Sequence, residues 1–532
     1  MKKALLFLVL LLIAVAIVLL LKRPGAATGQ LDSLVRIHFA GADAISSDTN
    51  STAFTNEFCS AEARVLESQT LDKLSRAPGA WFDNQLSAST NEGSALLRPL
   101  LDDFLKSEWF FQMSGSPAAP EYAVAIHLDA SRAQLWQTNL RSALESWTGV
   151  KARDISNGWE VKRDSSPSLF RFICTGDWVV IGCGDNELPL SEQWSEAGKI
   201  SENDGNWLSV DLDWPRLAQK FSAFAKFDFP AIKMQFVGMN GNFQVNGKFE
   251  LSQPLPSLEE WQTPTNIIHR PLSSFTAVRG FAPWLEEQTW AKWLVLSPEP
   301  DQAFIWSLRD PGQETFLAVP VANATNALAQ LGHNLVADTN WENHLFMSFT
   351  TDVASNRISW ENVPFITPEV LALNEPSGDC LLTDVSPFIP RGKGPQQQLL
   401  LALDRDNLVF YHWEITADRL EELPQLTQLA LFFANRRQLE LDSAAGKWLK
   451  LIGPTLGNCV TEVTQTGPTE LTLSRTAPAG LTAIELIALA NWLEAPNFPG
   501  CDLRVPSAPP IILHHKHKKL AAPAASPPPA AR

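Results

Sequence analysis

The stretch LFRFICTGDWVVIGC, from Leu169 to Cys183, decides the fold. Apolar residues flank Gly176 and Asp177 on both sides, a pattern that predicts an antiparallel hairpin with its turn at this pair. In that register Cys174 lies opposite Val179 and Cys183 opposite Phe170. The two sulfur atoms then lie on the order of 13 Å apart along the hairpin, too far for a disulfide. Both cysteines are therefore predicted to be small core residues.

The same alternation of strand and helix patterns extends outward from the hairpin and predicts an α+β domain over residues 34–252. Strands are expected over 35–39, 109–113, 122–128, 159–163 and 207–212, with helical stretches over 51–74, 94–106 and 131–147. Asp213 and Pro215 predict the N-cap and first turn of another helix. Asn240-Gly241 predicts the turn of a hairpin that joins 232–236 to 243–251.

A proline-containing segment over 253–265 is predicted to be a linker, and a second α+β domain is expected over 266–505. Strands over 316–321 and 408–413, helices over 324–331, 417–423 and 481–493, and a hairpin over 460–473 repeat the earlier pattern. The predicted fold class is α+β, with an N-terminal transmembrane helix followed by mixed helices and mainly antiparallel sheets.

Three strand-to-helix joints resemble one another, at residues 127–132, 211–216 and 412–419. In each, a strand ends near an acidic residue and an arginine follows in the first turns of a helix. The acidic groups complement the positive end of the helix dipole. One interpretation is that the chain contains two related tandem halves. The alternative is that capping chemistry alone produces the likeness.

The N-terminus carries an apolar run of 18 residues over 4–21, flanked by Lys2-Lys3 and Lys22-Arg23. As a helix this run is about 27 Å long, close to the ~30 Å hydrocarbon core of a bilayer. A cleaved signal peptide has a shorter apolar core followed directly by small residues. We therefore predict an uncleaved signal anchor over 1–24, a linker over 25–33, and a single-pass protein of a bacterial cytoplasmic (inner) membrane whose body is periplasmic. The alternative is a signal peptide cleaved at the small residues Gly25-Ala26-Ala27.

The composition limits the partners of the folded body. The formal net charge of −16 argues against nucleic acid, which requires clustered Lys and Arg. Hydrophobic residues make up 45% of the chain, enough to bury a core. None of the six cysteines forms a C-x-x-C pair, and no residue pattern calls for a cofactor.

No sequence motif for a phosphate-binding loop, a nucleophile elbow or a zinc protease is present. Asp211 and Asp213 could form half of a metal site, but the preferred interpretation is an exposed Asp211 and an Asp213 that caps a helix. His412 and Glu414 could form an acid/base pair, but their alternation with apolar residues favours a solvated strand face. The same interpretation is applied to His38.

The C-terminal residues 506–532 form a basic, Pro/Ala-rich segment that is predicted to be disordered. Lys516, Lys518 and Lys519 are candidates for contact with an anionic lipid or wall polymer. The alternative is a solubilising terminus without a function of its own.

The N-terminal anchor, the strand over 35–39 and the segment APAGLTAIE over 477–485 resemble a family of uncharacterised exported, membrane-anchored bacterial proteins. This resemblance implies an envelope location and no catalytic or binding residues. We expect a non-catalytic protein that binds envelope proteins or wall polymer. The alternative is an anchored hydrolase of polysaccharide or peptidoglycan. The location of the 19 tryptophans distinguishes these two functions. Buried rings favour the binding protein, and a Trp-lined cleft with two carboxylates favours the hydrolase.

Overall fold

The computed structural model describes much of the chain between Ser33 and Pro499. The residues of that range that are not described are 52–59, 83–89, 117–118, 165–167, 186–187, 198–204, 221–228, 270, 284–295, 297–298, 310–313, 338–347, 353–355, 362–367, 376–377, 385–393, 396, 423–441 and 497. The predicted anchor over 1–24, the linker before Ser33 and the tail over 506–532 lie outside the described residues.

Twenty strands form one sheet in which every described pairing is antiparallel. The first ten strands are β1 (Ser33–Phe39), β2 (Trp109–Ser116), β3 (Ala119–His127), β4 (Arg153–Ile155), β5 (Gly158–Lys162), β6 (Leu169–Thr175), β7 (Trp178–Gly184), β8 (Leu208–Leu212), β9 (Ala231–Met239) and β10 (Asn242–Glu250). We call these ten strands the first set.

The second set comprises the remaining ten strands. They are β11 (Leu272–Arg279), β12 (Gln302–Leu308), β13 (Thr315–Pro320), β14 (Ser348–Asp352), β15 (Arg357–Glu361), β16 (Glu369–Glu375), β17 (Gly378–Asp384), β18 (Leu408–Ile415), β19 (Asn458–Gly467) and β20 (Glu470–Ala477). The segment predicted as a linker, 253–265, connects the two sets along the chain.

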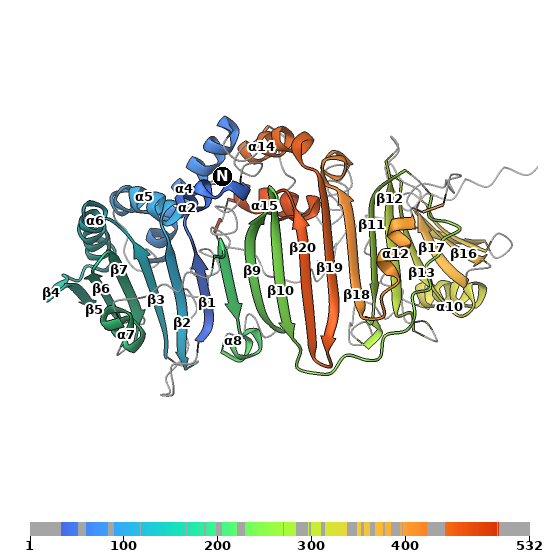
Figure 1. Cartoon of the computed structure of the whole chain (residues 1–532), viewed down its shortest axis with the longest axis horizontal. Coiled ribbons are helices and arrows are strands. Elements are labelled where there is room, and N and C mark those ends of the chain that lie inside the picture. The colour runs from blue at the N-terminus through green and yellow to red at the C-terminus, as the bar shows by residue number, and fades with distance from the viewer. Residues whose placement is uncertain are drawn as a thin grey trace, which may run out of the picture.

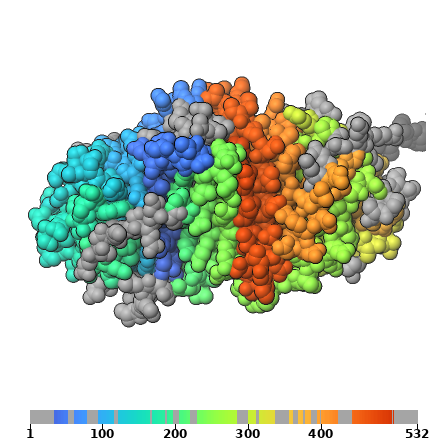
Figure 2. Space-filling view, viewed as in Figure 1, coloured from blue at the N-terminus to red at the C-terminus, as the bar shows by residue number. Residues whose placement is uncertain are grey.

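The strands of the two sets follow the same order across the sheet. From one edge to the centre the order is β4-β5-β6-β7-β3-β2-β1-β8-β9-β10. From the other edge it is β14-β15-β16-β17-β13-β12-β11-β18-β19-β20, so each strand takes the place of the strand numbered ten lower. β10 pairs with β20 and makes the sheet continuous (Figure 1; Figure 2).

Helices lie in the connections between strands. They are α2 (Ala42–Ser47), α4 (Ala61–Phe82), α5 (Thr90–Lys106), α6 (Ala130–Thr148), α7 (Pro189–Ala197), α8 (Trp214–Lys220), α10 (Ala324–Ala337), α12 (Gln397–Leu403), a helix over 416–422, α14 (Ala444–Ile452) and α15 (Ala483–Glu494), with short 3-10 turns η1 (Thr49–Ser51) and η3 (Gly453–Thr455). Figure 1 places α4, α14 and α15 near the upper ends of the central strands.

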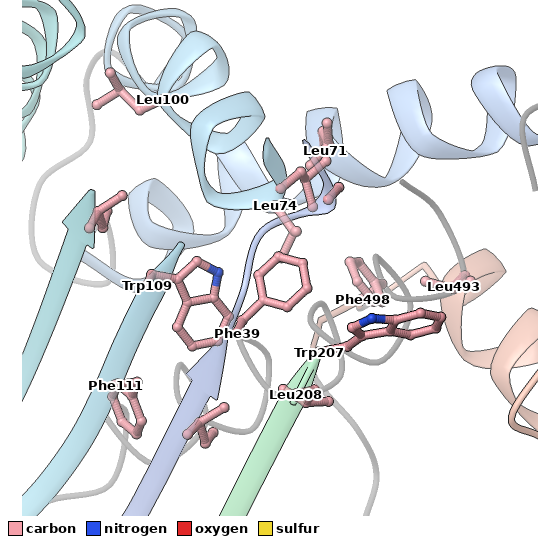
Figure 3. Close-up of a cluster of buried hydrophobic side chains, with 14 of the residues drawn as sticks. Phe39, Leu71, Leu74, Leu100, Trp109, Phe111, Trp207, Leu208, Leu493 and Phe498 are labelled. Atoms are coloured by element: carbon pink, nitrogen blue, oxygen red, sulfur yellow. The ribbon is translucent and has the colours of Figure 1, made fainter. Parts of the chain in front are cut away.

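The largest core lies between the first set and its helices, and both ends of the chain contribute to it. Phe39 and Trp109 come from the first strands, whereas Leu493 and Phe498 come from α15 and the segment after it. Figure 3 shows Leu493 and Phe498 near Trp207, on the same side of the sheet as Phe39. Lys73 of α4 also donates to the backbone carbonyl of Leu493 at 2.6 Å. The C-terminal helices therefore complete the core of the first set.

The main core of the second set lies on the opposite face of the sheet. Phe275 is in register with Trp413, which is in register with Val460, and both contribute to this core. Because register partners point to the same side, the whole cluster shares one face. Leu399 and Leu403 of α12 cover it, while α10 packs on the other face beside Leu381. Helices therefore cover both faces of the second set.

The sequence predictions for the described elements are largely confirmed. The hairpin over 169–183 has Cys174 opposite Val179 and Cys183 opposite Phe170, and both thiols are free. Asn240 and Gly241 both have positive φ, as the predicted turn requires. The α+β class with a large antiparallel sheet is confirmed. Within the described parts of the chain, no helix is both long and apolar enough to span a membrane.

Candidate functional site

A polar surface occupies the middle of the sheet, on the face opposite α15. It comprises side chains of six adjacent strands, which we call the polar central face. They are Arg36, Ser209, Asp211, Lys233, Gln235, Gln244, Asn246, Lys248, Glu462, Thr464, Thr472, Ser474 and Thr476. At a spacing of about 4.8 Å between strands, the six strands extend across about 24 Å.

Strand register places these side chains in rows that cross from the first set to the second. One row begins with Arg36, Asp211 and Lys233, and continues through Lys248 to Thr472. The next row runs from Ser209 through Gln235, Asn246 and Ser474 to Glu462. Partners in register point to the same side, so both rows lie on one face.

The polar central face is accessible and carries charges of both signs. Arg36, Asp211, Lys233, Gln235, Ser474 and Thr476 are exposed, and the other members are half-buried. Lys248 forms an ion pair with Glu470 at 2.6 Å, which raises the pKa of the lysine. The hydrophobic partners of these strands, such as Phe243 and Val245, point to the other side into the core. The sequence pattern predicts a polar side for each of these strands, but it does not predict that the six polar sides form one surface.

A buried polar network lies beneath α15, on the other face of the sheet. His412 Nδ1 is 2.8 Å from Thr276 Oγ1, and His412 Nε2 is 3.3 Å from Glu414 Oε2. That second contact has an ion-pair distance but lacks the alignment of a hydrogen bond. Glu414 Oε1 accepts hydrogen bonds from Thr416 Oγ1 and from the backbone N–H of Ala483 at 2.8 Å.

Electrostatics keep Glu414 ionised despite its burial. Burial alone raises the pKa of a carboxyl, but His412, the Ala483 amide and Thr416 outweigh it, so the pKa of Glu414 is lowered. Its strand neighbour Cys459 is affected differently, because burial raises the pKa of this thiol to about 12. Arg475, in turn, donates two hydrogen bonds to Glu485 in the first turn of α15.

The hydroxyl, imidazole and carboxylate of this network stand in the order of a nucleophile, a base and an orienting acid. However, one carboxylate oxygen is committed to the N-terminal amide of α15, and Glu414 is only 2% exposed. The helix dipole favours a negative charge at that position. The arrangement therefore holds α15 against the sheet, and we assign it a structural role.

Two sequence interpretations are corrected by this geometry. Glu414 and His412 do not lie on a solvated face, because α15 covers that side of β18. His38 is also buried: its Nε2 lies 3.0 Å from Glu108 and its ring stacks on Phe110 with centroids 4.2 Å apart. The cause differs between the two sites: a helix covers His412 and Glu414, whereas the side chains of Glu108 and Phe110 cover His38.

A second buried carboxylate also accepts the backbone N–H groups at the start of a helix, in the first set. Glu121 of β3 accepts hydrogen bonds from the backbone N–H groups of Leu190 and Ser191, both at 2.9 Å, at the start of α7. The hydroxyl of Ser191 also donates to it. Glu121 is 5% exposed, and burial raises its pKa.

The candidate metal site is not supported. Asp211 is exposed, and Asp213 accepts from the backbone N–H of Arg216 at 3.2 Å, which makes it the N-cap of α8. Among the described residues, no group of three or more His, Cys, Asp or Glu side chains is placed to hold a metal ion.

The tryptophans pack into the protein. Trp109, Trp159, Trp306 and Trp448 are almost fully buried. Every tryptophan whose side chain the structure describes belongs to a hydrophobic core or packs against one, and none of them is exposed, so core packing, the interpretation preferred from the sequence, is confirmed for them.

Lys516, Lys518 and Lys519, the predicted contacts for an anionic surface, lie outside the described residues. Their role stays a prediction. Comparison of the chain with protein-family models, with curated proteins and with solved structures finds no match.

Proposed function

We propose that this chain is a membrane-anchored extracytoplasmic protein that binds another envelope protein through the polar central face. Residues 4–21 span the cytoplasmic membrane in this proposal, and the sheet and its helices lie on the outer side. The protein acts by binding and not by catalysis.

The observation that carries this proposal is the position and chemistry of the polar central face. It spans β10 and β20, the strands that join the two sets, and six of its side chains are exposed. Its charged, amide and hydroxyl groups suit the polar contacts of a protein interface. This surface lies between the regions of the same face that pack against α7 and α12.

A protein partner is favoured over a wall polymer. Sugar rings stack on exposed aromatic side chains, and no described tryptophan is exposed. The polar central face itself contains no aromatic residue. Its mixed charges, with Arg36, Lys233 and Lys248 beside Asp211 and Glu462, provide the sign pattern that selects a complementary protein surface.

The hydrolase alternative gains no support from the described residues. A glycosidase needs two free carboxyl groups about 5–9 Å apart across a cleft. Glu121 and Glu414, the most buried glutamates of the described chain, are both committed to helix amides.

We also infer that the two sets are related tandem halves. The identical strand order supports this, as do helices α6 and α10 after the third strand of each set. Gly41 and Gly280, which follow the first strand of each set, both have positive φ. The joints at 211–216 and 412–419, noted in the sequence, follow β8 and β18, the eighth strands of the two sets.

Photo-crosslinking in cells tests the binding function. A crosslinking amino acid is placed at Gln235 or Ser474, on the polar central face, and as a control at Val65, an exposed residue of α4. We expect the same discrete adduct from both sheet positions and none of that mass from Val65. Ser474→Arg should abolish the adduct formed from position 235, whereas Val65→Arg should leave it. Equal crosslinking from all three positions would refute the proposal.

A further inference from the structure

The chain enters the folded body at one end of the central strands, where β1 begins and α8 lies. β1 begins at Ser33, the first described residue. The backbone N–H of Asp213, directly before α8, donates to the carbonyl of Leu34 at 2.9 Å. The start of α8 is thus fixed beside the point at which the N-terminal segment meets the sheet. We call this region the α8 edge.

An aromatic pair lies at the α8 edge. The rings of Trp214 and Phe229 have centroids 5.1 Å apart at an angle of 75°. Phe229 is 49% exposed, although phenylalanine is usually buried. Met239 has the same exposed fraction and lies at the far end of β9, a strand roughly 26 Å long that begins two residues after Phe229. What distinguishes Phe229 is therefore its location beside the entry of the chain.

The tether between the predicted span and the sheet is short. Eleven residues, 22–32, separate the apolar run from Ser33. Whatever its conformation, a chain of eleven residues spans at most about 40 Å. A body held so closely meets the bilayer surface at a high effective concentration, so weak contacts from the tethered edge are populated.

Charge does not oppose such a contact. The whole chain carries −16, which an anionic bilayer repels. Among the described side chains near α8, however, Arg36, Lys233 and Arg216 stand beside Asp211 and Asp213, so these cations outnumber these anions by one, and α8 ends at a further lysine, Lys220. Arg36, Asp211 and Lys233 are register neighbours, and Arg216 lies 3.3 Å from Asp213. The local charge is therefore close to neutral and slightly positive.

We propose that the α8 edge rests on the lipid bilayer, with Phe229 and Trp214 at the level of the lipid headgroups. Aromatic rings favour this interface because they combine a large apolar surface with a tolerance for polar surroundings. The contact orients the sheet relative to the membrane and leaves the exposed end of β9 at Met239 in water. This inference rests on the proposed membrane span over 4–21.

Fluorine NMR of the full-length chain in phosphatidylethanolamine/phosphatidylglycerol vesicles tests it. Phe229→4-trifluoromethylphenylalanine is compared with the same replacement at Met239, its control of equal exposure. A nitroxide on the lipid headgroup should enhance relaxation at position 229 several-fold over position 239. Equal relaxation at the two positions would overturn the inference.

A third replacement separates this inference from the proposed span. 4-Trifluoromethylphenylalanine at Leu12 should relax strongly with a nitroxide on the lipid acyl chain. Strong relaxation at 12 with none at 229 refutes the contact of the α8 edge and leaves the span intact. Strong relaxation at 229 with none at 12 supports the contact and refutes the span. Absence of relaxation at both positions refutes both.

Discussion

Glu121 in the first set and Glu414 in the second have the same structural role, but their pKa values are shifted in opposite directions. Both are buried on a strand, and both accept backbone N–H groups from the start of a helix, α7 or α15. Yet the pKa of Glu121 is raised, whereas the pKa of Glu414 is lowered. Burial and helix capping are common to the two sites, so neither explains the difference.

The neighbouring ionisable group determines whether the pKa of the buried carboxyl is raised or lowered. Burial raises the pKa of both carboxyl groups, and amide and hydroxyl donors lower it at both. At Glu121 the nearby charge is that of Glu192, which has the same sign and raises the pKa further. At Glu414 it is His412, which lowers the pKa. Of these two buried helix caps, the one beside a histidine has a lowered pKa and the one beside a second carboxylate has a raised pKa.

Glu414→Ala should cause the largest loss of stability. It removes the acceptor for Ala483 and Thr416 and leaves the half-buried His412 without its carboxylate partner. Breaking a buried pair by removing one partner costs about 3–5 kcal/mol. The free energy of unfolding, measured by urea denaturation with tryptophan fluorescence, should fall by this amount. Because α15 contributes to the core of the first set, both sets should be destabilised.

Thr416→Val is the matched control, because it removes one donor to Glu414 and retains the carboxylate and the volume of the side chain. We expect a much smaller loss than for Glu414→Ala. If the two variants were equally stable, Glu414 would not hold α15.

Glu121→Ala should have the second largest effect. The two backbone N–H groups of Leu190 and Ser191 would lose their acceptor in a buried site. Each unsatisfied buried donor costs about 1–3 kcal/mol. Both variants remove the acceptor of backbone donors, and we expect the smaller loss for Glu121→Ala because it leaves no histidine without its carboxylate partner. The same denaturation experiment measures it, and a larger loss than for Glu414→Ala would reverse the proposed ranking.

The pH dependence should have opposite signs at the two sites. Glu414 has a lowered pKa, so its stabilisation is present above the unfolded value of 4.5 and is lost as the pH falls through the folded pKa. Glu121 has a raised pKa, so its stabilisation is present below 4.5 and is lost as the pH rises through the folded pKa.

Replacement by glutamine, which does not titrate, separates these contributions. From acid to neutral pH, the stability gap between the natural chain and Glu414→Gln should widen. The corresponding gap for Glu121→Gln should narrow. Urea denaturation at a series of pH values measures both gaps, and parallel changes would show that His412 does not determine the difference.

Much of the fold could be predicted from local patterns. Asn240-Gly241 requires positive φ at both residues and therefore specified its hairpin, and the alternation around Gly176-Asp177 gave the correct register. The joining of the two sets could not be predicted in this way. The pairing of β10 with β20 links residues more than 200 positions apart, and no local pattern encodes which strands become neighbours.

The site was harder to predict than the fold. Gln244 and Asn246 alternate with Phe243 and Val245, so a polar face on β10 was readable. That the polar sides of six strands form one surface depends on the order of the strands. The burial of His412 and Glu414 depends on α15, which follows about 70 residues later along the chain. The same alternating pattern therefore gives an exposed polar face on β10 and a buried polar network on β18, because a helix packs over the polar side of β18 only.

Asp213→Ala should cause the smallest loss of stability. It compares a partly exposed helix cap with the two buried ones. Asp213 caps α8 as Glu414 caps α15, but its side chain is partly solvated, so water can replace the lost acceptor of Arg216. Loss of such a cap costs typically about 1 kcal/mol, and Asp213→Asn, which keeps an acceptor oxygen, should cost less. Urea denaturation midpoints measure both. If Asp213→Ala were as damaging as Glu121→Ala, burial of the cap would not set the cost of removing it.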